Sequence, residues 1–363
     1  MIIADSGWMA HALRLAEHGL HTTSPNPRVG CVLVKEGKVV GEGWHMRAGE
    51  PHAEVHALRA AGKAAHGATA YVTLEPCSHH GRTPPCADAL IAAGVTRVVA
   101  AMQDPNPLVA GQGLKKLAAA GIATDCGLME AAARELNIGF YTRMSRGIPW
   151  IRSKIAASLD GRTALNNGTS KWITGEAARR DVQHWRARSC AVLTGVGTVL
   201  ADDPQLNVRA IPAGRQPLRI VLDSHLRMPP NASILSGGAL LIYTASADAD
   251  KRAALQQSGA EIVLLPGANG QVDLHAVMRD MARRGINEVL VEAGRTLNGA
   301  LLKAGLVDEL VLYLAPQLLG DAARGMAELG ELTQLQQRVT MQWQDVRQVG
   351  GDLRIVARIT KEK

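Results

Sequence analysis

Three side chains in the first part of the sequence have the types and spacing of a catalytic zinc site. His52 opens the tripeptide His52-Ala53-Glu54, and the thiols of Cys77 and Cys86 follow further along the chain. One imidazole and two thiolates leave the fourth tetrahedral position of zinc open for water, which a catalytic site needs and a structural site lacks. Zinc lowers the pKa of its bound water from about 15.7 toward 7, so that hydroxide is available at neutral pH.

Glu54 is the expected proton carrier of this site. It lies two residues from His52, too close to be needed as the fourth ligand. Deamination requires protons on a ring nitrogen and then on the departing ammonia, and one carboxylate can relay both. The pattern H-x-E followed by P-C is the signature of zinc nucleobase deaminases. The residues therefore predict hydrolytic deamination.

The second half of that signature departs from its usual form. Cys77 and Cys86 enclose eight residues, whereas the usual pattern C-x-x-C encloses two. His80 stands at the position that C-x-x-C would give to its second cysteine. The spacing alone leaves two alternatives for the third ligand, Cys86 and His80.

The elements that must position these residues alternate along the chain. Hydrophobic periodicity and turn signals predict helices at 8–18, 51–61, 87–93, 113–120 and 131–137. They predict strands at 29–34, 38–41, 68–74, 95–101, 150–155, 191–194, 218–223, 239–243, 261–265, 288–292 and 309–314. This order places His52 at a helix start and Cys77 after a strand, and it indicates the α/β class, with helices on the faces of a sheet.

Two domains are expected for a chain of 363 residues. Nine of the twelve histidines and four of the five cysteines precede residue 148, so the two parts should perform different chemistry. Gly147-Ile148-Pro149 precedes a new apolar strand. We therefore place the domains at 1–147 and 148–363.

The second part lacks the motif G-x-G-x-x-G of standard dinucleotide-binding domains. It has two other glycine-containing turns after predicted strands, at 194–198 and 292–297. Small residues there would let backbone N–H groups approach a pyrophosphate at a helix N-terminus. Both turns are candidates for cofactor binding.

Composition narrows the class of protein. Hydrophobic residues make up 47% and charged residues 20%, which is typical of soluble globular proteins. We expect a cytoplasmic protein with reduced cysteines, because the sequence shows neither a signal peptide nor an apolar run long enough for a membrane. The net charge of +7 comes with only 3% aromatic residues, which favours a small anionic substrate over nucleic acid.

The cysteine segment also carries a family resemblance. The run 76–86 (PCSHHGRTPPC) resembles the bifunctional deaminase–reductases of riboflavin biosynthesis, as do 25–32 (PNPRVGCV), 49–54 (GEPHAE) and 104–107 (DPNP). The likeness covers nearly the whole chain. It implies a cytidine-deaminase-like three-layer α/β/α domain followed by a dihydrofolate-reductase-like α/β domain, and it favours Cys86 over His80 as the ligand.

For the first domain, the resemblance implies that zinc is bound by His52, Cys77 and Cys86 and that Glu54 is the proton shuttle. The substrate contacts that it implies are Asn26, His45, Arg82, Asp104 and Asn106. Asn and Asp side chains can read a pyrimidine edge, and arginine suits a phosphate. Alternatively, Asp104 and Asn106, which lie among prolines, only form a turn.

For the second domain, the resemblance implies reduction by NADPH. The implied cofactor contacts are Ala156, Trp172, Thr198, Asp202, Ser224, Gly294, Arg295, Thr296, Leu297, Asn298, Gly299 and Ala300. The implied substrate contacts are Lys154, Ser170, Thr174, Arg186, Leu206, Arg209 and Glu292. Either Lys154 or Glu292 would supply or position a proton. Arg295 is either a contact to the 2′-phosphate of NADPH or a surface arginine.

The resulting hypothesis is a bifunctional enzyme acting on a phosphorylated pyrimidine. The first site would deaminate 2,5-diamino-6-ribosylamino-4(3H)-pyrimidinone 5′-phosphate, and the second would reduce the ribosyl chain to ribityl with NADPH. One alternative is a zinc deaminase of nucleic-acid bases with an accessory second domain. Another is a non-catalytic scaffold with structural zinc. We expect a homo-oligomer that binds neither nucleic acid nor membrane.

Overall fold

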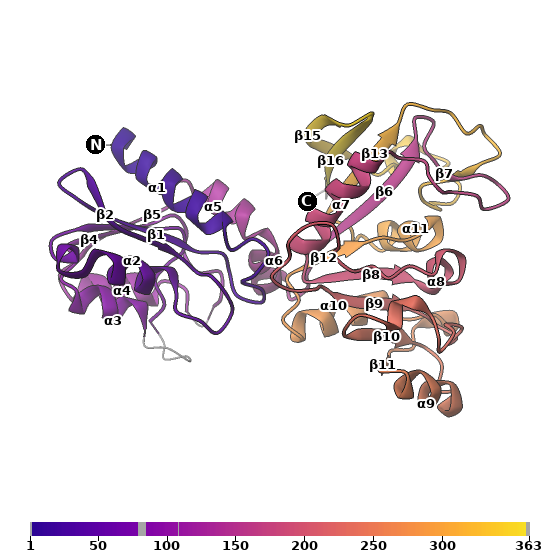
Figure 1. Cartoon of the computed structure of the whole chain (residues 1–363), viewed down its shortest axis with the longest axis horizontal. Helices are drawn as coiled ribbons and strands as arrows, with labels where there is room; N and C mark the ends of the chain where they lie inside the picture. Colours follow the sequence, from indigo (N-terminus) through magenta and orange to yellow (C-terminus); the bar gives the residue numbers. More distant parts are fainter. Residues whose placement is uncertain (1, 79–84, 108, 361–363) are drawn as a thin grey trace. The chain divides into compact units, whose positions relative to one another are not determined.

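The chain divides into two compact units, residues 1–147 and 148–363 (Figure 1). The structure is a computed structural model, and it describes residues 2–78, 85–107 and 109–360. Each unit has a sheet and a hydrophobic core of its own.

The first unit is a five-stranded sheet between two layers of helices (Figure 1). The strand order is β2-β1-β3-β4-β5, with β1 antiparallel to both neighbours and the last three strands parallel. The strands are β1 (Gly30–Lys35), β2 (Lys38–Trp44), β3 (Thr69–Val72), β4 (Arg97–Ala100) and β5 (Ala123–Cys126). The helices are α1 (Ile2–Glu17), α2 (Ala53–Ala61), the 3₁₀ turn η1 (Gly62–Ala65), α3 (Cys86–Ala92), α4 (Gln112–Ala119), α5 (Glu130–Leu136) and α6 (Ile138–Arg146). Helices α1 and α5 cover one face of the sheet, and α2, α3 and α4 cover the other.

Two glycines of β2 let α2 lie directly on the sheet. A Cβ atom at Gly43 would lie 2.8 Å from the carbonyl oxygen of Ala53, and one at Gly41 would lie 2.3 Å from that of Ala57. Any side chain at these positions would push the helix outward. The close approach therefore fixes the start of α2, where His52 and Glu54 lie.

The second unit is built on a nine-stranded sheet of order β11-β10-β9-β8-β12-β6-β13-β16-β15. The first seven strands of that order are parallel, and the last two are antiparallel. The large-sheet strands are β6 (Trp150–Ser158), β8 (Ala191–Gly195), β9 (Leu218–Leu222), β10 (Leu240–Thr244), β11 (Ala260–Leu264), β12 (Glu288–Val291), β13 (Glu309–Ala315), β15 (Met341–Val349) and β16 (Asp352–Ile359). A small second sheet pairs β7 (Arg162–Ala164) with β14 (Arg324–Gly325).

The helices of the second unit connect successive parallel strands. They are α7 (Glu176–Arg188), α8 (Val196–Asp202), α9 (Ala249–Gln257), α10 (Leu274–Arg283) and α11 (Arg295–Lys303). Three 3₁₀ turns, η2 (Ser233–Leu235), η3 (Ala268–Gly270) and η4 (Leu335–Gln337), lie in the connections. Helix α8 follows β8 directly, and α11 follows β12 after three intervening residues. Both connections lie at the carboxyl ends of the strands, which is where open parallel sheets bind ligands.

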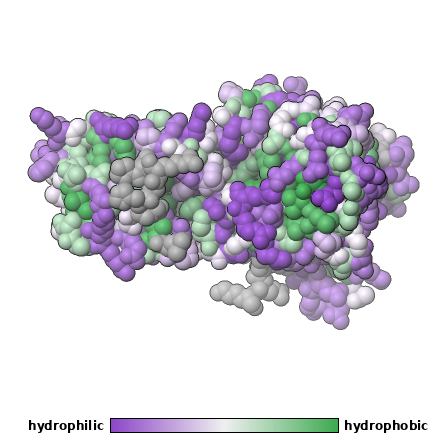
Figure 2. Space-filling model, turned by 90° about the horizontal axis from the view of Figure 1, so that it is seen from below, coloured by the Kyte–Doolittle hydropathy of each residue, from purple (hydrophilic) through white to green (hydrophobic). Residues whose placement is uncertain are grey.

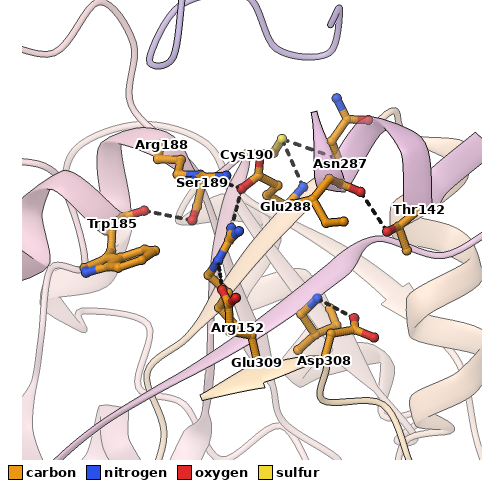
Figure 3. Close-up of polar contacts among 12 residues, drawn as sticks. Thr142, Arg152, Trp185, Arg188, Ser189, Cys190, Asn287, Glu288, Asp308 and Glu309 are labelled. Atoms are coloured by element: carbon orange, nitrogen blue, oxygen red, sulfur yellow. Dashed lines mark hydrogen bonds and ion pairs between the residues drawn. The ribbon is translucent and has the colours of Figure 1, made fainter. Parts of the chain in front are cut away.

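A buried ion cluster joins the amino ends of three of these strands (Figure 3). The Arg152 side chain in β6 is 1% exposed, and it contacts Glu288 of β12 and Glu309 of β13. Its Nε atom lies 2.5 Å from Glu309, and Arg188 Nε lies 2.9 Å from Glu288. The cluster therefore ties together β6, β12 and β13, and the opposite end of β12 carries one of the two glycine turns.

Surface hydropathy varies from place to place within each unit. On the face drawn in Figure 2, hydrophilic residues are widespread, and an apolar area of the second unit is bordered by them. Within the described parts of the chain, no helix has both the length and the hydropathy needed to cross a membrane.

Candidate functional site

Three possible metal ligands converge in the first unit. The ligand atoms of His52, Cys77 and Cys86 all lie within 4.8 Å of one another. His52 Nδ1 lies 3.6 Å from Cys77 Sγ and 3.3 Å from Cys86 Sγ. Ligand bonds of about 2.3 Å to sulfur and 2.0 Å to nitrogen at the tetrahedral angle put the nitrogen and each sulfur about 3.5 Å apart. The donor set and its spacing therefore fit one zinc ion.

The ends of two helices position these ligands. His52 immediately precedes α2, and Cys86 is the first residue of α3. The Cys77 segment is bound to α3, because the Ala87 N–H donates to the Cys77 carbonyl at 3.1 Å. The Cys86 N–H also points at Cys77 Sγ, at 3.3 Å. Contacts with the Cys86 thiol and with His52 lower the pKa of Cys77 to about 4, which favours the thiolate that a metal needs.

Glu54 lies in the first turn of α2 and is 3% exposed. Burial raises its pKa to about 7, although the neighbouring His52 acts in the opposite direction. A carboxyl group in such surroundings can take up and release a proton near neutral pH. Its place beside the three ligand residues suits the relay expected from the sequence.

Asn26 and His45 form a hydrogen-bonded chain beside the ligands. His45 Nδ1 lies 3.1 Å from the Pro51 carbonyl, to which it donates, and so Nε2 accepts from the Asn26 amide at 3.2 Å. The rings of His45 and His52 meet edge to face, with centroids 5.3 Å apart. Burial lowers the pKa of His45, which favours this neutral tautomer. Two of the expected substrate residues are thus adjacent to the zinc ligands.

Of the other substrate residues expected in the first unit, the structure describes Asp104 and Asn106. Asp104 accepts the N–H of Asn106 at 2.8 Å, which is the turn-forming role that the sequence left open. This bond occupies one carboxylate oxygen and does not exclude a contact with substrate. Arg82 and the alternative ligand His80 lie outside the described residues.

A large cavity lies at the carboxyl ends of the parallel strands in the second unit. Its volume of about 1780 Å³ exceeds that of an ordinary ligand pocket, about 300–1,000 Å³, so two ligands can fit side by side. All seven expected substrate residues line it: Lys154, Ser170, Thr174, Arg186, Leu206, Arg209 and Glu292. The expected cofactor residues that line it are Ala156, Trp172, Thr198, Asp202, Ser224, Gly294, Arg295, Thr296, Leu297 and Ala300.

Two other residues expected at the cofactor support the helix α11 from within. Asn298 is 1% exposed, and its amide donates to the carbonyls of Ala293 and Met326. A Cβ atom at Gly299 would lie 2.3 Å from the Glu328 carbonyl oxygen. Neither residue is among those that line the cavity.

The glycine turns form a cradle at the cavity wall. Gly197 and Gly294 both line the cavity, and a Cβ atom at either would meet no atom within 4 Å. The backbone is therefore open toward the cavity at both positions. Gly294 precedes the nine-residue helix α11, whose first N–H groups are suited to a phosphate. This arrangement fits the pyrophosphate of a dinucleotide.

Three charged side chains meet at one end of the cavity. Both oxygens of Glu292 are bound by Arg186, at 2.5 and 3.0 Å. Burial raises the pKa of Glu292, but Arg186 and Lys154 outweigh it, so the pKa lies below its usual value. Burial also lowers the pKa of Lys154. Glu292 is therefore held in its ionised form, and Lys154 releases a proton more easily than an ordinary lysine.

Comparisons with known proteins match both units. The family model "RibD C-terminal domain" matches residues 149–355, and "Cytidine and deoxycytidylate deaminase zinc-binding region" matches residues 3–102. Riboflavin biosynthesis protein RibD of Escherichia coli K12 is 53% identical over 96% of this chain and 98% of its own. The chain belongs to the RibD family.

Solved structures agree with this assignment. Acinetobacter baumannii RibD is 46% identical, with a TM-score of 0.93 over 99% of this chain and 100% of its own. A Thermotoga maritima diaminohydroxyphosphoribosylaminopyrimidine deaminase/5-amino-6-(5-phosphoribosylamino)uracil reductase is 32% identical, with a TM-score of 0.87 over 99% of both chains.

The family decides several expectations. The chain is a bifunctional deaminase and reductase of riboflavin biosynthesis, with a zinc-binding deaminase region and an NADPH-dependent reductase domain. The two-part α/β fold inferred from the resemblance is confirmed. A non-catalytic scaffold is thereby excluded.

This RibD-family chain also contains residues at its sites that sequence reasoning did not single out. Glu75 is 3% exposed and accepts four backbone N–H groups beside the cysteine segment. Arg227 lines the cavity next to Ser224, beyond the glycine turns. Glu75 could have been suspected from its place directly before Pro76-Cys77, and Arg227 from its place in the turn after a predicted strand.

Two arginines of the cavity differ in how they are engaged. Arg295 forms an ion pair with Glu328 at 2.7 Å, and its side chain is 48% exposed. Among the described residues, the Arg227 guanidinium has no hydrogen-bond or ion-pair partner. The Ser224 hydroxyl is bound to Gln271 and to the Val272 N–H, both at 3.1 Å. Arg227 is therefore a cavity-lining cation whose donors are not bound within the described part of the chain.

Proposed function

We propose that the first unit removes the 2-amino group of a diaminopyrimidinone ribosylamino phosphate and that His52, Cys77 and Cys86 hold the zinc ion. The substrate is the one named for the Thermotoga maritima relative. Bound zinc would supply the Lewis acid that makes water nucleophilic at neutral pH. The spacing of the three donor atoms, all within 4.8 Å, is the observation that carries this proposal.

Glu54 moves the protons of this reaction. Its carboxylate takes a proton from water and delivers it to a ring nitrogen. It then takes the proton of the hydroxyl group added to the ring carbon and passes it to the amino group, which leaves as ammonia while the hydroxyl becomes a carbonyl. Asn26, oriented by His45, presents its amide to the pyrimidine edge. Asp104 and Asn106, from the segment 104–107, form further hydrogen bonds with the same pyrimidine ring. Arg82, beside the cysteines in the sequence, meets the phosphate.

The second unit opens and reduces the ribose of the deaminated product. NADPH supplies the hydride, and the chain supplies position and charge. Lys154 donates the proton, because burial lowers its pKa while Glu292 is held as a carboxylate by Arg186. Arg209 binds the sugar phosphate, since within the described ranges its guanidinium makes only a long contact of 3.4 Å to Asn207, whereas Arg186 is bound to Glu292.

The cofactor would be held along the carboxyl ends of the strands. In the sheet order, β6, β12, β8 and β9 are successive neighbours, so about 14 Å separates β6 from β9. The residues that would hold a dinucleotide run from Lys154 on β6 through Gly294 after β12 to Arg227 after β9. Arg227 there suits a 2′-phosphate, which an arginine typically accommodates in enzymes that use NADPH. Arg295, paired with Glu328, has the role of a surface arginine.

A coupled assay tests both halves of the proposal. The purified chain is given the diaminopyrimidinone phosphate with and without NADPH, and ammonia and NADPH are followed together. We expect ammonia in both cases and NADPH oxidation only after deamination. Release of ammonia from cytosine or adenine in oligonucleotides, with none from the pyrimidinone phosphate, would instead favour a nucleic-acid deaminase.

We also propose that the chain forms a homo-oligomer through the edge of its large sheet. On β15, Trp343 is 66% and Val346 is 56% exposed, and their partners across the strand pair are Ala357 and Ile355. Trp343 and Val346 lie on one face of β15. Since β15 is the last strand of the sheet, its free edge can pair with the same strand of a second copy about a two-fold axis. Light scattering after size exclusion should show a dimer or larger species. Trp343→Ser should shift it toward monomer, and an unchanged mass would contradict this interface.

A further inference from the structure

Glu75 is buried beside the metal ligands, and it is not one of them. It follows β3 and directly precedes Pro76-Cys77. The Glu75 N–H donates to the Met102 carbonyl at 2.9 Å, which extends the pairing of β3 with β4. Its side chain is 3% exposed. Its backbone is therefore fixed by the sheet, and its carboxylate points into the protein.

The carboxylate accepts four backbone N–H groups from one segment. Oε2 accepts those of Asp104 at 3.1 Å and Gly111 at 2.8 Å. Oε1 accepts those of Gly113 at 2.8 Å and Leu114 at 3.2 Å. One oxygen thus binds both ends of the segment 104–111, and the other binds the first turn of α4.

Helix α4 depends on this carboxylate for its N-terminal cap. Its N-cap residue is Gly111, which has a φ of +75° and no side chain to accept the first N–H groups. Glu75 supplies the missing acceptor from another part of the chain, and a negative charge at this helix end is favourable. Gly113 permits the contact, because a Cβ atom there would lie 1.9 Å from the Pro76 carbonyl oxygen.

The segment held in this way carries two of the proposed substrate contacts. Asp104 is bound through its own N–H to Glu75, and it accepts the Asn106 N–H at 2.8 Å. The Asn106 carbonyl in turn accepts the N–H groups of Val109 and Ala110, both at 2.9 Å. The two residues are therefore linked to Glu75 by a short series of hydrogen bonds.

We propose that Glu75 is a positioning residue of the deaminase site. It fixes Asp104 and Asn106 relative to Cys77, which follows Glu75 by two residues. This inference rests on the proposed deaminase function. Glu75 sets where the substrate is held, and it takes no part in moving protons. Its loss should therefore raise the KM of deamination and leave kcat and zinc binding largely intact.

The test uses Glu75→Gln in the full chain. The amide keeps one acceptor oxygen but turns an NH₂ group toward two N–H donors, so one pair of bonds is lost. We expect the KM of ammonia release to rise about tenfold or more, because bonds to a charged group are lost, with kcat changed by less than about threefold. Zinc per chain and NADPH oxidation with the deaminated intermediate should match those of the wild type.

Glu130→Gln is the matched control, because Glu130 lies on α5 in a half-exposed pair with Arg134. It should leave KM, kcat and zinc content unchanged. Hydrogen exchange gives a second measurement: the amides of Asp104 and Gly111, or those of Gly113 and Leu114, should exchange faster in Glu75→Gln. Should that variant not fold, Glu75→Asp carries the test, because its shorter side chain cannot reach all four donors.

The outcomes separate this inference from the proposed function. Suppose that the wild-type chain releases ammonia and that Glu75→Gln has an unchanged KM and a lower melting temperature. Glu75 would then have only a structural role, and this inference alone would be overturned. Loss of zinc in Glu75→Gln would also overturn it, since the residue would then act on the metal ligands. A wild-type chain that releases no ammonia would overturn both.

Discussion

At the scale of single residues, the deaminase site has two parts: three metal ligands that lie close together, and a buried carboxyl group beside them. His52, Cys77 and Cys86 provide one nitrogen and two sulfurs for a metal, and Glu54 lies beside them at 3% exposure. A structural zinc site would have a fourth protein ligand in place of this arrangement. Proton transfer and metal binding are therefore assigned to different residues, and they can be separated by mutation.

Glu54→Gln should bind zinc as the wild type does but release ammonia about 10²- to 10⁴-fold more slowly, the usual contribution of a general acid–base group. The amide has nearly the same shape but cannot carry a proton. Zinc per chain by atomic absorption and the initial rate of ammonia release check the two halves of this prediction. Deamination at the wild-type rate would mean that another group relays the protons.

Much of this site could be predicted from residue types, and some of it could not. The order of His52-Ala53-Glu54 and Pro76-Cys77 along alternating helices and strands predicted a zinc site, but the spacing left Cys86 and His80 open until the family resemblance favoured Cys86. Glu75 was missed because its partners are backbone N–H groups roughly thirty or more positions later, and backbone donors leave no side-chain pattern.

At the scale of elements, close packing of α2 on β2 holds the start of that helix in place. A Cβ atom at Gly43 would lie 2.5 Å from the His56 Cβ and 2.8 Å from the Ala53 carbonyl oxygen. The helix would have to move outward to admit it. Such a movement would carry His52 and Glu54 away from the two thiols.

Gly43→Ala should therefore weaken zinc binding and deamination together. Overpacking of this kind costs about 1–3 kcal/mol in stability. Zinc titration and thermal unfolding test the variant. Gly7→Ala in α1 is the control, because a Cβ atom there meets no atom within 4 Å and alanine favours a helix by about 1 kcal/mol. If Gly43→Ala binds zinc as tightly as Gly7→Ala does, the helix position is not what orders His52.

The elements themselves were only partly predictable. The apolar runs predicted each parallel strand of the second unit's large sheet to within a few residues, for example 261–265 for β11, which spans Ala260–Leu264. The hairpin of β15 and β16 was missed, although Gly350-Gly351 between them is a usual hairpin turn. The apolar–polar alternation along β15 is interrupted by Gln344-Asp345, where the strand has a register shift. The helix α6 was also missed, since its sequence mixes Gly, Thr and Ser with its apolar residues.

At the scale of the whole molecule, each of the two units has a sheet and a hydrophobic core of its own. The cluster of Arg152 with Glu288 and Glu309 joins three strands of the second unit near their amino ends (Figure 3). Burial raises the pKa of Glu309, but Arg152 outweighs it, so its pKa lies below the usual value. Glu309 therefore contributes stability above the usual carboxyl pKa, and this contribution is lost as the pH falls through the lowered one.

Arg152→Met should destabilise the second unit by about 3–5 kcal/mol at neutral pH, because two buried carboxylates lose the buried cation that they share. Each keeps one more exposed arginine, Arg188 at Glu288 and Arg358 at Glu309. The difference in unfolding free energy between wild type and variant should become smaller in acid, where those carboxylates become neutral in the variant. Urea unfolding at pH 7.5 and in mild acid measures the difference. Arg283→Met is the control, since its side chain is 72% exposed. A deficit that is independent of pH would contradict the role given to the ion cluster.

Removal of the metal is the measurement that tests the central claim most directly. The full chain is dialysed against a chelator, and ammonia release and NADPH oxidation are each measured with their own substrate before and after one equivalent of zinc is returned. We expect ammonia release to stop and then recover, while reduction of the deaminated intermediate continues throughout. Undiminished ammonia release from a chain shown to be free of metal would contradict the account.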